Sequence, residues 1–149
     1  MPKKLKITTL QDAKQACFNG AVRGLSWQKW EQSKIGASCA LNDGNGCHCA
    51  IGWLVPPEKY DSCVVGAQGA LEVGILADPI MDWYRASSRE ERADLKTFLI
   101  DMMISHDKNS TPEYMCDSFQ KLGLLYNLTW PTGADPSQAP IQADVIQTL

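Results

Sequence analysis

The stretch GASCALNDGNGCHCAIGWLVPPEKYD, residues 36 to 61, decides the fold that the sequence predicts. Two short apolar runs flank a polar, glycine-rich segment at residues 42 to 46. Its Asp-Gly and Asn-Gly steps tolerate the positive φ angles of a hairpin tip, so we expect an antiparallel β-hairpin over residues 37 to 55. Pro56 and Pro57 cannot continue a ladder of backbone hydrogen bonds, and they should end the second strand in a rigid turn.

Helical patterns fill the chain on both sides of this hairpin. Thr9 is a good N-cap for a helix over residues 9 to 22, with Asp12 in its first turn. A longer helix should follow Ser88, because Ser-Arg-Glu-Glu is a capping-box sequence and apolar residues recur after it at helical spacing. Shorter helical segments are expected at residues 25 to 35, 64 to 73 and 80 to 85. The predicted fold class is therefore α+β, with one short antiparallel hairpin packed against four or five helices.

The last helix of the domain is expected to begin at Pro112 and to end at Gly123, since proline suits a first helical turn and glycine suits a helix end. We expect its inward face to carry Tyr114, Met115, Phe119 and Leu122. We expect the chain to leave the domain with Leu124, Leu125 and Leu128 packed.

Composition divides the 149 residues into three parts. Residues 1 to 130 suit a single globular domain, and residues 131 to 140 form a Pro-rich linker. The segment 141 to 149 is apolar and too short to be a stable helix alone, so it should dock on its own domain or on a partner, and it could hold a homo-oligomer together. On a short helix its apolar stripe would comprise Ile141, Val145, Ile146 and Leu149.

Charge and hydropathy exclude several classes of protein. The formal net charge is -3 and the sequence pI is near 5.3, which disfavours nucleic-acid binding. No run approaches the roughly 18 apolar residues of a membrane span, and the basic amino-terminal stretch lacks the apolar core of a signal peptide. We therefore expect a cytoplasmic protein without a membrane partner, whose six cysteines stay reduced.

The run Cys47, His48 and Cys49 is the candidate metal site. Zinc usually takes four ligands, and the sequence offers no second Cys-x-x-Cys or His-x-x-x-His pair. If a metal binds, its ligands would be Cys39, Cys47, His48 and Cys49, although the hairpin register leaves open whether Cys39 meets Cys47 or Cys49. Buried thiols that behave as small hydrophobes account for the same residues, and no cofactor is expected.

His106 and Asp107 are the candidate half of a catalytic set. A thiol enzyme needs a cysteine, a histidine base and an orienting group, with Cys49 or Cys63 as the possible nucleophile here. His106 also closes the apolar stripe of its helix, and a partly buried histidine near a helix end explains it without catalysis. No residue is therefore assigned as catalytic.

Aromatic residues are the remaining candidates for binding. Trp27 and Trp30 lie three positions apart and share one face if they are helical, so they cover either the core or a binding surface. Trp53 and Tyr60, with Asp61 beside them, could line a small pocket that stacks a nucleobase. The full set of candidate ligand- or partner-binding residues is Trp53, Tyr60, Asp61, His48, Trp27, Trp30, His106 and Asp107.

Residues 49 to 61, CAIGWLVPPEKYD, resemble the C-A-I-G-x-L-[IV]-P-x-E-x-Y-D signature of small bacteriophage and prophage proteins. His106 and Asp107 resemble a second, weaker element of that family, and the similarity extends over residues 10 to 128. The family has no assigned activity. The resemblance implies a phage or mobile-element origin and no particular chemistry.

Three functions remain compatible with these patterns. The first is a non-enzymatic phage protein in the host cytoplasm that inhibits a host immune protein or sequesters a nucleotide immune signal. The second is a metal-binding protein or a thiol enzyme built on the cysteine and histidine residues. The third is a structural homo-oligomer held by residues 141 to 149.

Overall fold

The computed structural model describes residues 6–31, 34–35, 38–39, 49–59, 70–72, 74–108 and 111–131. Among these residues the α-helices are α1 (Leu10–Trp27), α3 (Asp78–Ala86), α4 (Arg89–Asp107) and α5 (Pro112–Leu125). The same ranges contain the 3-10 helices η1 (Gly52–Leu54) and η2 (Pro57–Lys59) and the strands β1 (Lys34–Ile35) and β2 (Ser38–Cys39).

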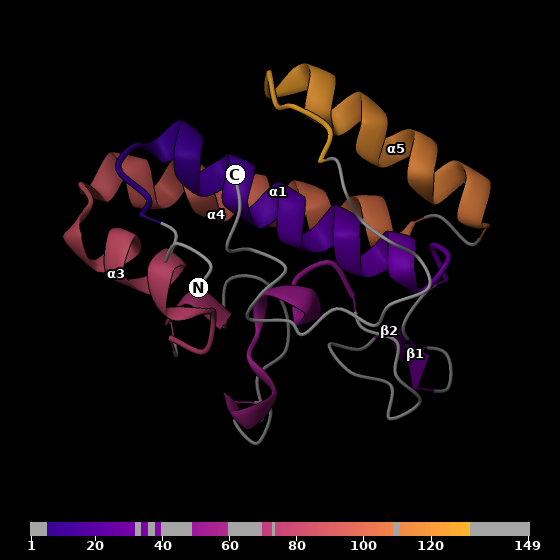
Figure 1. Ribbon diagram of the computed structural model, residues 1–149, viewed down its shortest axis with the longest axis horizontal. Coiled ribbons are helices and arrows are strands. Elements are labelled where there is room, and N and C mark those ends of the chain that lie inside the picture. The colour runs from indigo at the N-terminus through magenta and orange to yellow at the C-terminus, as the bar shows by residue number, and fades with distance from the viewer. Residues whose placement is uncertain are drawn as a thin grey trace, which may run out of the picture.

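Helix α1 lies at the centre of this arrangement. It contacts α3, α4 and η1, and α5 packs on α4 (Figure 1). From Ala13 to Leu25 most of the α1 side chains are buried, which is expected for a helix covered on several sides. The buried core joins α1 to η1, α3, α4 and α5.

The amino-terminal end of α1 is fixed by the predicted N-cap, Thr9, which forms a capping box with Asp12. Thr9 Oγ1 accepts a hydrogen bond from the Asp12 backbone N–H at 3.0 Å, and the Asp12 carboxylate accepts one from the Thr9 N–H at 3.3 Å. The helix is longer than expected, because residues 9 to 22 and the first part of 25 to 35 form one helix that ends at Trp27. Lys29 and Trp30 then take left-handed backbone angles, with φ of 57° and 61°.

The predicted α+β fold class is wrong: the described part of the chain is a helical fold. Residues 52 to 54 form the buried helical turn η1 instead of a strand. The strand pairing seen among described residues joins Lys34 to Cys39 and Ile35 to Ser38, two residues on each side and too short to form a layer. A short unbroken apolar run fits a buried helical turn as well as a buried strand, and hydrophobic spacing alone cannot separate the two.

Helix α4 matches its prediction. The Ser88 hydroxyl accepts from the Glu91 backbone N–H at 3.2 Å, and the Glu91 carboxylate accepts from the Ser88 N–H, which completes the capping box. The apolar stripe is buried as expected, at Leu95, Phe98, Leu99, Met102 and His106. The segment 80 to 85 lies within α3, and of residues 64 to 73 the described Ala70, Leu71 and Glu72 are helical.

Helix α5 begins at Pro112 as predicted, but it does not end at Gly123. Gly123 is buried against Phe18, where an added Cβ atom would lie 3.0 Å from Phe18 Cζ. The helix continues to Leu125, and the left-handed residue that follows is Asn127, with φ of 55°. Gly123 therefore lies in a close helix contact and not in a turn.

The described residues end at Pro131, the first residue of the predicted linker. The rest of that linker and the predicted tail at 141 to 149 lie outside the described residues. Within the described ranges, no helix combines the length and the apolar character needed to cross a bilayer.

Candidate functional site

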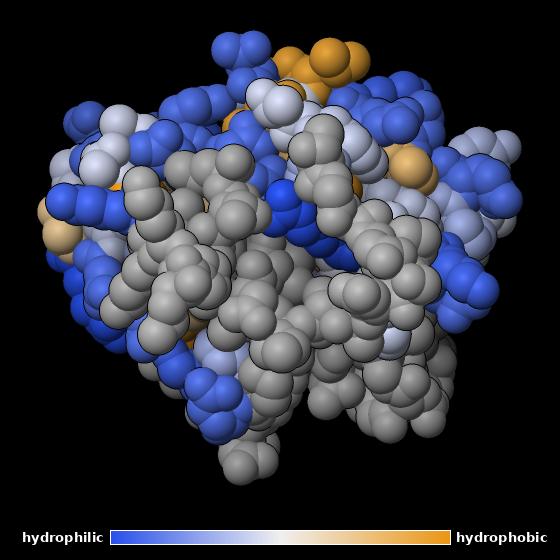
Figure 2. Space-filling view, in the orientation of Figure 1, coloured by the Kyte–Doolittle hydropathy of each residue, from blue (hydrophilic) through white to orange (hydrophobic). Residues whose placement is uncertain are grey.

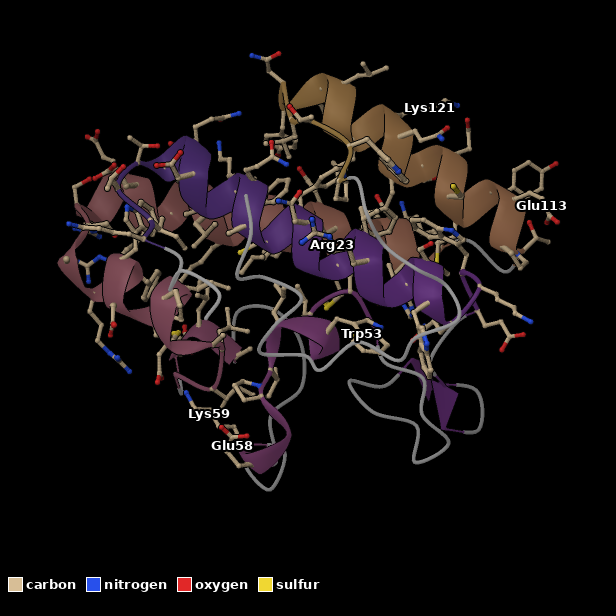
Figure 3. All side chains as sticks on the ribbon, in the orientation of Figure 1. Arg23, Trp53, Glu58, Lys59, Glu113 and Lys121 are labelled. Atoms are coloured by element: carbon tan, nitrogen blue, oxygen red, sulfur yellow. The ribbon has the colours of Figure 1, made fainter. Side chains whose placement is uncertain are left out.

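Trp53 is a core residue and not the wall of an open pocket. It is 2% exposed, and its ring packs edge-on against Trp27 with centroids 6.0 Å apart. Its indole Nε1 donates to Gln28 Oε1 at 2.9 Å, so its polar atom is satisfied inside the protein. Gly24 of α1 lies directly over the ring, and Figure 3 shows Trp53 below α1. These contacts leave no ring face for a nucleobase.

Trp30 belongs to a different aromatic cluster from Trp27. It packs on Phe119 with centroids 5.7 Å apart and stacks on Trp130 at 5.9 Å, and Phe18 also contacts these two rings. Trp27 and Trp30 were expected to share a face only if both are helical, and this condition is not met because α1 ends between them. The prediction that both cover the core is confirmed.

His106 lies fully inside the protein at the end of α4. Its exposed fraction is 0%, and its Nδ1 atom is 2.7 Å from Asp107 Oδ1. These two neighbouring candidates are thus in hydrogen-bond contact. A ring with no exposed surface presents no edge to a substrate, and this geometry favours the structural interpretation of His106.

The described thiols suit packing better than nucleophilic chemistry. Burial raises the pKa of the Cys17 thiol to about 12, and burial together with the Asp117 charge raises the pKa of Cys116. With raised pKa values, both thiols are protonated near neutral pH. Because the thiolate is the reactive form, neither is suited to act as a nucleophile. Cys49 is buried, and its Sγ atom accepts a hydrogen bond from the Gly52 N–H at 3.3 Å.

The predicted metal site is not seen in the part of the chain that the structure covers. No group of three or more potential metal-ligating side chains occurs among the described residues. Cys39 pairs through β2 with Lys34, and Cys49 belongs to no strand. Cys47, His48 and Cys63 lie outside the described residues, as do Tyr60 and Asp61.

The diproline motif fastens η2 to the start of α3. The Lys59 ammonium donates to the Leu76 carbonyl at 3.1 Å and lies 3.1 Å from Asp78 Oδ1. Figure 3 shows Glu58 and Lys59 at the lower edge of the molecule, on the opposite side from α5. For its described residues, this motif has a structural role.

A cavity of about 430 Å³ lies between residues 6 to 8 and helix α3. Its walls include the apolar side chains of Ile7 and Trp83, and its charged groups are Lys6, Asp82 and Glu91. Two carboxylates and one ammonium suit an anionic nucleotide poorly, since the net charge repels phosphate. This cavity gives no support to nucleotide sequestration.

The carboxyl-terminal end of α5 carries an exposed apolar surface that the sequence did not predict. Leu124 is 82% exposed and Leu125 is 76% exposed, although both were expected to pack, and Leu128 alone of the three leucines packs on the core. Figure 2 shows hydrophobic atoms standing out over this end of α5. We call the surface formed by Leu124 and Leu125 the α5 face.

Tyr114 also corrects a prediction, because it was expected to face inward and is 68% exposed. It precedes Leu125 by eleven residues, about three helical turns, so it lies on the same side of α5 but about 16 Å away. Helix α5 therefore turns an apolar side chain to the exterior at both ends.

Comparisons with protein-family models, with characterised proteins and with solved structures returned no match. The α5 face is the described feature that most resembles a binding site.

Proposed function

We propose that this chain is a non-enzymatic binding protein that recognises a host protein through the α5 face. The observation that carries the proposal is the exposure of two adjacent leucines, Leu124 and Leu125, at a helix end. Contiguous apolar surface on a protein marks interaction sites, whereas single exposed leucines need no explanation. An apolar helix end fits the groove of a partner protein.

The free energy gained by burying these two leucines is large enough for a specific contact. Full burial of one leucine side chain contributes about 1.5–3 kcal/mol, so the pair could contribute about 3 kcal/mol or more to binding. Because each 1.4 kcal/mol corresponds to a factor of ten, removing both side chains should weaken binding about 100-fold.

The proposed biological setting comes from the resemblance at residues 49 to 61. It supports a phage or mobile-element origin, and with it action in the host cytoplasm against a host-defence protein. The nucleotide-signal alternative has less support, because Trp53 is sealed in the core and the cavity beside α3 carries an excess of carboxylates. Buried Cys17, Cys49 and His106 give the thiol-enzyme alternative little support.

The test uses three forms of the full chain as bait in host lysate: the wild type, the double variant Leu124→Ser with Leu125→Ser, and Tyr114→Ser. All three changed side chains are exposed, so folding should be retained. Each retained protein is identified, purified and titrated against the three baits by calorimetry. The proposal predicts a partner that binds the wild type and Tyr114→Ser equally and the double variant about 100-fold more weakly.

Equal affinity for the wild type and the double variant would refute the α5 face as the site. A chain that binds only a second copy of itself through Leu124 and Leu125 would instead support the structural homo-oligomer.

A further inference from the structure

The chain leaves the domain at a fixed point on α1. The Gln11 side chain donates to the Tyr126 and Asn127 carbonyls, each at 3.1 Å. The Gln15 amide donates to the Thr129 carbonyl at 2.8 Å and accepts from the Thr129 N–H at 2.9 Å. Residues 126 to 129 are thus held against α1 by four hydrogen bonds to two side chains.

Trp130 anchors the last step of this exit. Its ring stacks on Trp30 and meets Phe18 edge-on, with centroids 5.9 Å and 5.8 Å away. Everything after Pro131 therefore starts from a fixed place near the end of α5. Five residues separate Trp130 from Leu125, so the anchor lies at most about 18 Å from the α5 face.

The segment that follows has the length and pattern to cover that face. Ten residues lead from Pro131 to Ile141, and a Pro-rich linker extends by about 3.1 Å per residue, or up to about 31 Å. The stripe that begins at Ile141 continues with Val145, Ile146 and Leu149. A short tether of this kind keeps the tail at an effective concentration of roughly millimolar near the face.

We propose that residues 141 to 149 cover the α5 face of the same chain when no partner is bound, so that a partner must displace them. The exposed leucines of the α5 face are in contact with water, which is unfavourable for apolar side chains. The segment 141 to 149 is too short to form a stable helix alone. Docking buries both. The displacement step rests on the proposed function, whereas the docking itself does not.

The tail would then set the apparent affinity for the partner. A ligand whose site is open only part of the time binds more weakly in proportion to the open fraction. If the face is covered about nine-tenths of the time, deletion of residues 141 to 149 should strengthen partner binding about tenfold.

Hydrogen–deuterium exchange of the full chain, read by mass spectrometry, tests the docking without any partner. Amides at 141 to 149 should exchange about tenfold more slowly in the wild type than in Leu124→Ser with Leu125→Ser, since each amide is protected only while docked. Tyr114→Ser is the matched control and should leave the protection intact. The amides of α4 should exchange alike in all three proteins, which verifies that each is folded.

Three results would overturn the proposal. Exchange at the rate of an unstructured peptide in the wild type would show that the tail does not dock. Equal protection in the wild type and the double variant would show that it docks elsewhere. Protection that disappears on dilution would assign the docking to a second copy and would likewise refute a contact within one chain.

Failure of the proposed function gives a different result. If no host protein binds the α5 face while residues 141 to 149 remain protected, the docking inference stands and the binding function falls. If a partner binds the α5 face and residues 141 to 149 are unprotected, the binding function stands and the docking inference falls.

Discussion

Gly24→Ala should destabilise the protein strongly, even though alanine favours helix over glycine. Gly24 lies within α1, and a Cβ atom added there would stand 2.1 Å from Trp53 Cγ and 2.1 Å from Trp53 Cδ2. Carbon atoms in contact prefer about 3.5–4.0 Å, so the Trp53 ring or the helix must shift by well over 1 Å.

The surroundings of Trp53 prevent an inexpensive shift. Its ring is buried, its Nε1 atom donates to Gln28 at 2.9 Å, and its ring makes a T-shaped contact with Trp27. Overpacking costs about 1–3 kcal/mol, and loss of a buried hydrogen bond costs about 1–3 kcal/mol more. The gain in helix propensity returns about 1 kcal/mol, which leaves a net loss of about 3 kcal/mol.

Urea and thermal denaturation followed by far-UV circular dichroism would measure this loss. For a chain of this length, about 3 kcal/mol corresponds to a fall in Tm of about 6–12 °C. Gly123→Ala is the matched control, because its Cβ atom would lie 3.0 Å from the far edge of the Phe18 ring and needs only a small adjustment. Its stability should stay within about 1 kcal/mol of the wild type. A Gly24→Ala variant as stable as the wild type would refute the packing of α1 on η1.

Two further predictions follow from the described titratable groups. The Tyr126 hydroxyl donates to Asp101 Oδ2, and burial, followed by this hydrogen bond, raises the pKa of Tyr126 to about 12 from its ordinary 10.0. Because the unfolded chain loses this proton at lower pH than the folded chain, the free energy of unfolding should fall between about pH 10 and pH 12. Tyr126→Phe should lack this fall in stability. Identical dependence of Tm on alkaline pH in the two proteins would contradict the prediction. Iodoacetamide should label Cys17 only after unfolding, since burial raises the pKa of this thiol to about 12. Site-resolved mass spectrometry would measure the labelling, and rapid labelling of Cys17 in the folded protein would refute this prediction.

The helices were predictable because their ends and faces carry local chemical patterns. The structure confirms Thr9 as an N-cap and the capping box of Ser88 with Glu91. The apolar stripe from Leu95 to His106 identified the buried face of α4. These features depend on residues three or four positions apart, so they can be recognised before the tertiary structure is known.

The η1 region was not predictable in the same way. Its residues are apolar at every position, so no periodicity distinguishes a strand from a buried helical turn. The glycine-rich segment before it favoured a hairpin by its turn residues, yet Gly52 begins a 3-10 helix packed under α1. What fixes η1 is Trp53 seated against Gly24, a contact between residues 29 positions apart.

The α5 face was missed for a related reason. Met115, Phe119 and Leu122 are buried at helical spacing, which either Leu125 or Tyr126 could continue; Tyr126 packs on the core and Leu125 is exposed. Whether a leucine at the end of an apolar stripe is covered depends on the length of the neighbouring elements. The stripe itself therefore indicated the direction of packing but not its extent.

Native mass spectrometry tests the central claim, that Leu124 and Leu125 bind a host protein. The wild-type chain and the variant Leu124→Ser with Leu125→Ser would be purified from bacterial host cells without chelators and compared at equal concentration. We expect a species with one added host protein for the wild type and the bare single chain for the variant. The same added mass in both samples, or a bound nucleotide or metal ion in place of a protein, would contradict it.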